Sequence, residues 1–142
     1  MSHPAGSVES LRVQCAAEPE FVGWLAQAGG TLIVSTYQAG KVAMIGYDGR
    51  QTTLVMRQFD KPLGVAVQGE RLALATRHDL MVFANAPLLA PHVLEDQPGR
   101  YDALYLPRAS YHTGGLNVHD VAFQGEDLVF VNTRFSCLAR VS

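Results

Sequence analysis

The sequence holds only two cysteines, Cys15 and Cys137, in 142 residues. Two cysteines so far apart form neither a disulfide framework nor the paired spacing of a zinc site, so a reducing cytoplasm is the expected location. No apolar run reaches the roughly 18–20 residues that cross a bilayer, so no membrane partner is predicted. The first ten residues have neither the basic nor the apolar region of a secretory signal.

An excess of charge of either sign is also missing. Eleven Lys and Arg residues against 13 Asp and Glu residues give a net charge of −2, with no basic run, so no nucleic-acid partner is predicted. The chain has no Gly-x-Ser-x-Gly, no phosphate-binding glycine loop and no Cys-x-x-Cys. No cofactor is therefore predicted. Whether the chain is an enzyme is left open, with a non-enzymatic function favoured.

The N-terminal part of the chain predicts a single helix. Residues 1–10 are small and polar and are expected to be disordered, whereas residues 11–142 are expected to form one domain. A helix is predicted over residues 19–28, because Pro19 suits a first helical position and Gly29-Gly30 ends the segment. Its apolar side chains follow helical spacing at Phe21, Trp24, Leu25 and Ala28.

The remainder of the chain reads as short β-strands. Runs rich in β-branched and aromatic residues are separated by short turn sequences, and the DGR sequence at 48–50 is a strong hairpin signal. Residues 86–115 differ, because they hold four of the seven prolines. This segment is predicted to be a long inserted loop with one short strand near residues 103–106.

One phrase occurs twice in the chain. VAVQGERLALATR at 65–77 recurs as VAFQGEDLVFVNTR at 121–134, an offset of 56 residues, and a fainter copy at 32–36 precedes residues 72–76 by 40 residues. An insertion of about 16 residues reconciles the two offsets with a period of about 40, which is typical of β-propeller blades. The alternative reading is that any two β-hairpins with tight polar turns look alike.

The predicted fold is therefore mostly all-β: a partial β-propeller of two to three blades of antiparallel strands, with one short N-terminal helix. The blades are expected at about residues 31–60, 61–106 and 117–142. A propeller needs at least about four blades to close. We therefore expect either that the chain is the N-terminal part of a longer protein, whose missing C-terminal blades close the ring, or that copies of it assemble.

Several motifs resemble a bacterial family known only as conserved hypothetical proteins. The resemblance runs in order from about residue 32 to the end, and its motifs are VSTYQAGKV (34–42), FDKPLGVAV (59–67), LALATR (72–77), LPRASYHTGG (106–115) and FVNTRFSCLA (130–139). It implies a propeller-like fold and whole proteins of about twice this length or more, and it implies no activity. One departure from the family's LPRASHxTG motif is that Tyr111 precedes His112.

A polar site is predicted on one face of the blades. The strands of a blade run A to D outward from the axis, and the loops that enter strand A open on the same face as the B–C turns. The turns supply Tyr37, Gln38, Lys41, Arg77, His78, Asp79, Asn132, Thr133, Arg134 and Ser136, and the entry loops supply Asp60, Lys61, Asn117, His119 and Asp120. The inserted loop adds Arg108 and His112. The predicted ligand-binding residues are Tyr37, Lys41, Arg77, His78, Arg108, His112, Asn117, His119, Asp120, Asn132 and Arg134, and the expected partner is a small anionic ligand or a protein.

Each of these residues has a structural alternative. The two arginines, Arg77 and Arg134, suit bidentate binding of a carboxylate or phosphate, or else ion pairs with nearby aspartates. His119 and Asp120 suit an acid–base pair, but adjacent strand residues point to opposite faces, which favours a structural histidine. Cys137 is expected to be a small buried apolar residue rather than a nucleophile.

The leading functional hypothesis is an uncharacterised propeller-type binding or scaffold module. A rival is a metal-assisted, lactonase-like hydrolase that uses oxygen ligands from Asn117, Asp120 and Asn132. These three are weak ligand candidates because no second acidic ligand is evident, so no metal is predicted. A third hypothesis is a β domain that shields its open edges by self-association.

Overall fold

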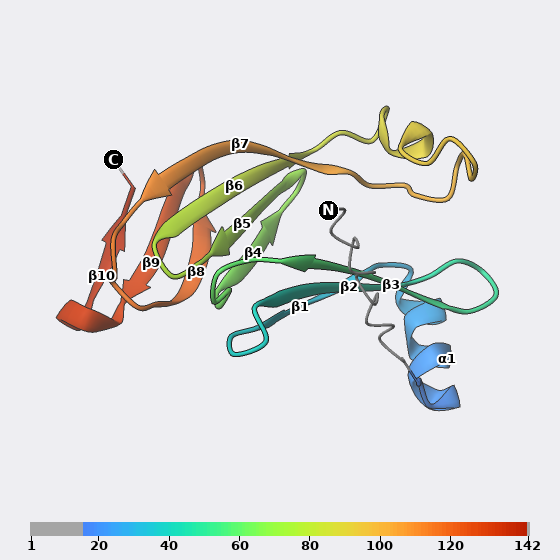
Figure 1. The fold of residues 1–142 in the computed structure, drawn as a ribbon, viewed down its shortest axis with the longest axis horizontal. Helices are drawn as coiled ribbons and strands as arrows, with labels where there is room; N and C mark the ends of the chain where they lie inside the picture. The colour runs from blue at the N-terminus through green and yellow to red at the C-terminus, as the bar shows by residue number, and fades with distance from the viewer. Residues whose placement is uncertain (1–15, 142) are drawn as a thin grey trace, which may run out of the picture.

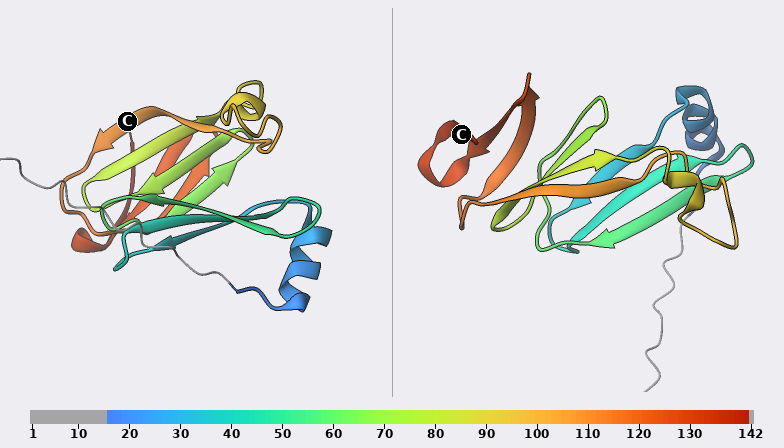
Figure 2. Two further views of the ribbon diagram at one scale, coloured as in Figure 1. Left: turned by 45° about the vertical axis from the view of Figure 1, so that its right-hand side comes forward. Right: turned by 90° about the horizontal axis from the view of Figure 1, so that it is seen from above.

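The computed structural model describes residues 16–141, so Cys15 and the segment 1–10 that was expected to be disordered lie outside the described residues. The described chain forms three antiparallel sheets and one α-helix, with the second sheet between the other two (Figure 1; Figure 2). This confirms the predicted mostly-β fold with propeller-like blades and one short helix. The first sheet contains β1 (Leu32–Thr36), β2 (Lys41–Tyr47) and β3 (Thr52–Gln58). The second contains β4 (Val65–Gln68), β5 (Arg71–Ala75), β6 (Asp79–Asn85) and β7 (Tyr105–His112), and the third contains β8 (Val118–Gln124), β9 (Asp127–Asn132) and β10 (Cys137–Arg140).

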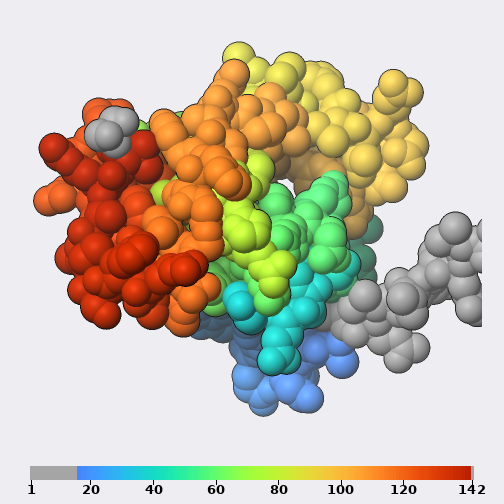
Figure 3. Space-filling view, turned by 60° about the vertical axis from the view of Figure 1, so that its left-hand side comes forward, coloured from blue at the N-terminus to red at the C-terminus, as the bar shows by residue number. Residues whose placement is uncertain are grey.

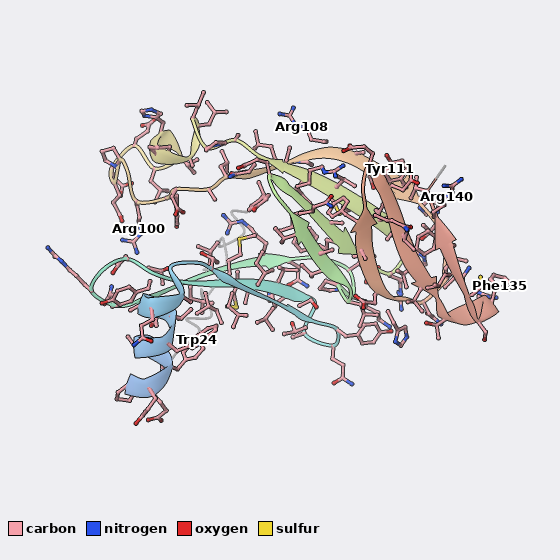
Figure 4. The ribbon with its side chains drawn as sticks, turned by 180° about the vertical axis from the view of Figure 1, so that it is seen from behind. Trp24, Arg100, Arg108, Tyr111, Phe135 and Arg140 are labelled. Carbon is pink, nitrogen blue, oxygen red and sulfur yellow. The ribbon has the colours of Figure 1, made fainter. Side chains whose placement is uncertain are left out.

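The helix α1 (Pro19–Ala28) has the predicted bounds. Gly29 ends it in the left-handed conformation, with φ of 61°, and donates its backbone N–H to the Leu25 carbonyl. Leu25 is buried, whereas Trp24 is more than half exposed and stacks on Phe21 (Figure 4). The apolar stripe therefore contributes one fully buried side chain to the domain.

The predicted DGR hairpin joins β2 to β3. The Asp48 carboxylate accepts hydrogen bonds from the backbone N–H groups of Gln51 and Arg50, at 2.9 and 3.0 Å. These two bonds stabilise the charged carboxylate and lower the pKa of Asp48. Gly49 has a φ of 91°, a conformation that favours glycine.

The two copies of the repeated phrase fold alike. Both hairpins turn at a glycine with positive φ, Gly69 and Gly125, 56 positions apart. Two non-glycine residues, Lys61 and Asn117, are also in the left-handed region and are also 56 positions apart. Such residues are uncommon there because the Cβ atom crowds the backbone.

The inner strands of the second and third sheets also share a β-bulge. In the second sheet the backbone of Ala75 bonds two consecutive residues. The Leu63 N–H donates to the Ala75 carbonyl at 2.9 Å, and the Ala75 N–H donates to the Gly64 carbonyl at 2.8 Å. In the third sheet the pairing of β8 with β9 shifts between Val118 and Val121, which leaves His119–Asp120 as the bulge. A bulge changes the direction of the side chains around it. The simple alternation assumed for His119 and Asp120 therefore does not hold at this point.

The core has two parts, one on each face of the second sheet. Leu72, Leu74 and Phe83 pack toward Val42 of the first sheet. On the opposite face, the small residues Ala66, Ala73 and Ala75 join Leu80 in packing against the third sheet, whose contributions are Val118, Val121, Leu128 and Phe130. Alternate residues of β5 therefore enter different cores, as the period of two along a strand requires.

The inserted segment differs from the prediction of one short strand near residues 103–106. The strand β7 begins at Tyr105 and continues to His112, paired along its length with β6. Pro107 is tolerated because β7 is the outermost strand of its sheet and the register shifts between Val82 and Phe83. The remaining loop is shorter than predicted and includes the short 3₁₀ helix η1 (Ala90–His92).

Tyr105 couples the core between the first and second sheets to pH. Its ring packs against the cluster around Leu72, and burial, together with the negative charges of Glu70 and Asp102, raises the pKa of the phenol. A raised folded-state pKa means that stability present below the unfolded-state value of about 10 is lost at higher pH. We expect wild type to lose more unfolding free energy than Tyr105→Phe between about pH 8 and about pH 10.5 in urea titrations. Equal losses in the two proteins would contradict this assignment.

Candidate functional site

A polar pocket of about 130 Å³ opens where loops of all three sheets meet. Its walls come from the β1–β2 turn, the β3–β4 loop, the β5–β6 turn and the loop that leads into β8. These are the B–C turns and strand-A entry loops that sequence analysis placed on one face. The lining residues are Tyr37, Lys61, Leu63, Thr76, Arg77, Asn117 and Val118.

Two hydrogen-bonded turns hold the pocket walls in place. The Thr76 hydroxyl donates to the Asp79 carbonyl at 3.1 Å and accepts from the Asp79 N–H at 3.2 Å. Thr36, 40 positions earlier, makes the same pair of bonds with Lys41 at 3.0 and 3.1 Å. Each threonine closes the turn that carries the next pocket residue, Tyr37 or Arg77. The turn geometry therefore follows from the side chain that ends each strand.

The β3–β4 loop is tied to both neighbouring turns. Ser35 of β1 donates its hydroxyl to the Leu63 carbonyl, and the Arg77 N–H donates to the Asp60 carbonyl at 2.9 Å. Lys61 lies between these two anchor points. Its ammonium nitrogen is 5.1 Å from the centre of the Tyr37 ring, a cation–π distance. The anchored loop thus holds a lysine and a tyrosine together at the pocket.

Lys61 and Asn117 both line the pocket and are two of the three described non-glycine residues with positive φ. A left-handed backbone costs roughly 1–2 kcal/mol per such residue, and strain of this kind concentrates at binding sites. The two residues come from equivalent loops of the second and third sheets. The repeated conformation brings both side chains to the same pocket.

The charge of the pocket is positive. Lys61 and Arg77 line it, and no carboxylate is among the lining residues. Within residues 16–141 the ion pairs are Arg71–Glu126, His112–Asp79 and Arg140–Asp127, so neither pocket cation is neutralised by a described acid. Arg77 therefore does not form the ion pair that was its structural alternative. Two cations that form no ion pair with a described acid, beside a tyrosine and an asparagine, can donate several hydrogen bonds to an anion.

The two histidines of the second sheet lie elsewhere. The rings of His78 and His112 are 6.2 Å apart, and His112 Nδ1 is 3.2 Å from a carboxylate oxygen of Asp79. The backbone N–H and the hydroxyl of Thr113 both donate to the His78 carbonyl, and these bonds connect the end of β7 to the β5–β6 turn. This exposed cluster joins the β5–β6 turn to the end of β7 and does not line the pocket.

Of the eleven predicted ligand residues, three line the pocket: Tyr37, Arg77 and Asn117. Lys41 instead closes its turn through its backbone, and Arg108 projects from β7 on the outside of the second sheet (Figure 4). Sequence analysis placed Lys61 in an entry loop but did not choose it as a ligand residue. Its match with Asn117 at the offset of 56 is the signal that could have identified it.

The predicted residues of the third sheet have local partners. The Asn132 side-chain oxygen Oδ1 accepts the Phe135 N–H at 3.2 Å and so caps the 3₁₀ helix η2 (Thr133–Phe135). Arg134 donates to the Gly115 carbonyl at 3.2 Å. Asp120 accepts the Val121 N–H at 2.9 Å, and no bond joins it to His119 among the described contacts. These residues shape the loops around the pocket without lining it.

The described residues contain no group of three or more His, Cys, Asp or Glu side chains arranged to hold a metal ion. Of the three weak ligand candidates only Asn117 lines the pocket, whereas the Asn132 side chain caps η2 and Asp120 lies in the bulge. Cys137 was expected to be buried but is exposed, because β10 is the outermost described strand of the third sheet. Within residues 16–141, no helix is long and apolar enough to span a bilayer.

Comparisons with known proteins identify a family to which no activity is assigned. The model of the family Domain of unknown function (DUF4915) matches residues 19–142, which is most of the chain. Comparison with curated proteins found no match, and comparison with solved structures found none either. The expected membership of an uncharacterised family is confirmed. The family match assigns no chemistry to the pocket.

Proposed function

We propose that this chain, which belongs to the family Domain of unknown function (DUF4915), is a binding module whose polar pocket takes a small anion or the anionic group of a larger ligand. The observation that carries the proposal is that Lys61 and Arg77 line the same pocket and that no carboxylate is among its described lining residues. A pocket of about 130 Å³ is smaller than the usual site for a drug-sized molecule, which favours a single charged group.

The surrounding residues support an oxygen-rich anion. Arg77 offers a planar set of N–H donors, and Lys61 offers a compact charge that the Tyr37 ring helps to position. The Asn117 amide, on the wall formed by the loop that leads into β8, adds a neutral donor. Carboxylates and phosphates use donors of these kinds, and both remain open as ligands.

The test is anion binding by charge-removal variants. We expect Lys61→Gln and Arg77→Gln each to weaken binding of inorganic phosphate by about 10- to 100-fold, because each removes a charge-assisted hydrogen bond. Phosphate and acetate titrations followed by NMR chemical shifts measure the affinities and show whether the shifts gather at the pocket. Wild-type resonances that do not respond to either anion would contradict the proposal.

A matched control removes the same charge elsewhere. Arg50 is exposed in the β2–β3 turn, where only its backbone N–H bonds Asp48, so Arg50→Gln is expected to leave the affinities unchanged. If Arg50→Gln and Arg77→Gln weakened anion binding equally, the affinity would depend on the net charge of the protein, and the pocket would not be the binding site.

The other predicted functions have less support. A scaffold function is compatible with the same pocket if the anionic group belongs to a protein side chain. The metal-assisted hydrolase stays a prediction, and of its three candidate ligands only Asn117 is among the residues that line the pocket. A cytoplasmic location and a bacterial origin also stay predictions.

A further inference from the structure

The outer face of the third sheet carries an apolar strip at one end of the stack of sheets. We call this face the C-terminal face; its apolar residues are Ala122, Val129, Val131 and Leu138, and the Arg140–Asp127 ion pair lies beside them on the same face. Figure 3 shows the third sheet forming one flank of the molecule, and Figure 4 shows Phe135 projecting beside it. Leu138 is 74% exposed. Apolar side chains that are exposed or half-buried and lie side by side on one face, as Leu138 and Val131 do, mark a candidate interface.

The C-terminal face has a buried counterpart inside the domain. By strand register and the offset of 56, Ala122, Val129 and Val131 correspond to Ala66, Ala73 and Ala75. Leu138 pairs with Val131 as Leu80 pairs with Ala75. In the second sheet this face is covered by the third sheet, and Leu80 is 0% exposed. At these four positions the third sheet thus repeats an apolar face that the domain elsewhere covers with another sheet, and it differs at Arg140, which takes the place of Val82.

The first sheet carries the complementary face at the other end of the stack. We call it the N-terminal face, and its residues include Leu32, Val34, Ala43 and Ile45. Leu32 and Val34 correspond to Leu72 and Leu74, which pack on the first sheet, and to Leu128 and Phe130, which pack on the second. Yet Leu32 and Val34 remain 36% and 37% exposed. The chain therefore carries both halves of an interface that occurs twice within it.

We propose that the C-terminal face of one copy binds the N-terminal face of a second copy, head to tail, in the manner of the internal sheet contacts. The two faces differ, so the contact is heterologous. A difference at the inner edge fits this arrangement. Gly64 allows β8 to lie close to β4, whereas the corresponding residue of the third sheet is Asp120. The first strand of the first sheet, β1, corresponds to β5 and β9, so this sheet has no described strand that corresponds to β4 or β8. A second copy therefore brings no described strand against Asp120.

The experiment uses one disabled face in each of two variants. Leu138→Asp places a charge on the C-terminal face, and Val34→Asp places one on the N-terminal face. Sedimentation of wild type should show mass that rises with concentration. Each variant alone should be monomeric, with the dissociation constant raised about 30-fold or more, as for loss of an interface hot spot. An equimolar mixture should form a heterodimer, because one intact face of each kind remains.

Each other outcome overturns the proposal. A wild-type protein that stays monomeric at the highest concentration reached shows that the two faces do not bind each other. Self-association of Val34→Asp alone shows that like faces pair. Association that survives Leu138→Asp points to pairing through the edge of β10. A monomeric mixture of folded variants shows that the two faces are not complementary.

Two controls keep the result interpretable. Leu88→Asp, at a residue that is 87% exposed on the inserted loop, should associate like wild type. Circular dichroism checks that each variant is folded. If Val34→Asp does not fold, Leu32→Lys disables the same face at a neighbouring position.

Discussion

Replacing Leu72 or Leu128 by alanine is expected to lower the free energy of unfolding by roughly 2–5 kcal/mol in each case, the range for buried large-to-small changes. The two leucines hold corresponding positions in the repeated phrase, and they are 4% and 5% exposed. Leu72 packs between the first and second sheets, and Leu128 packs between the second and third. Each substitution therefore removes apolar contacts from a different core. Urea unfolding of the two variants measures the loss.

The control is the same substitution at an exposed position. Leu88 is on the inserted loop, so Leu88→Ala is expected to change the free energy of unfolding by no more than about 0.5 kcal/mol, as for ordinary surface changes. A neutral result at Leu72 or Leu128 would contradict the correspondence that buries both.

Gly64→Ala is expected to destabilise the contact between the second and third sheets by about 3 kcal/mol, at the upper end of the cost of overpacking. A Cβ atom at Gly64 would be 2.7 Å from the Asp120 Cα and 2.8 Å from the Val121 backbone nitrogen. Both are backbone atoms, so no side-chain rotation relieves the contact. The sheets must separate, which also disturbs the entry loops on either side of the pocket. Thermal unfolding and the phosphate titration measure the two effects.

A second glycine gives the opposite expectation. Gly23 lies in the interior of α1, and an added Cβ meets nothing within 4 Å. Gly23→Ala is therefore expected to stabilise the protein by roughly 0.5–1 kcal/mol through helix propensity. If Gly64→Ala stabilised the protein as Gly23→Ala is expected to do, this result would contradict the close approach of the Asp120–Val121 backbone to Gly64.

The candidate site shows how far sequence reasoning reached. Tyr37, Arg77 and Asn117 were identified because their positions at turns and entry loops follow from the strand order of a blade. Asn132 and Arg134 occupy turns of the same kind, but their polar groups are used by η2 and by Gly115. Position in a repeat predicts which loop holds a residue. It does not predict whether a neighbouring backbone group already binds that side chain.

The sequence by itself determined the elements of this protein: the bounds of α1, the hairpin turns, and the alternation that sends Leu72 and Ala73 to opposite faces of β5. Such features depend on neighbouring residues and on the period of two along a strand. Only the tertiary structure decided that Lys61 joins Arg77 in one pocket, that Gly64 serves a close approach, and that Cys137 and Leu138 are exposed. Those outcomes depend on contacts between residues that are distant in the chain, and local sequence patterns do not contain the distances between them.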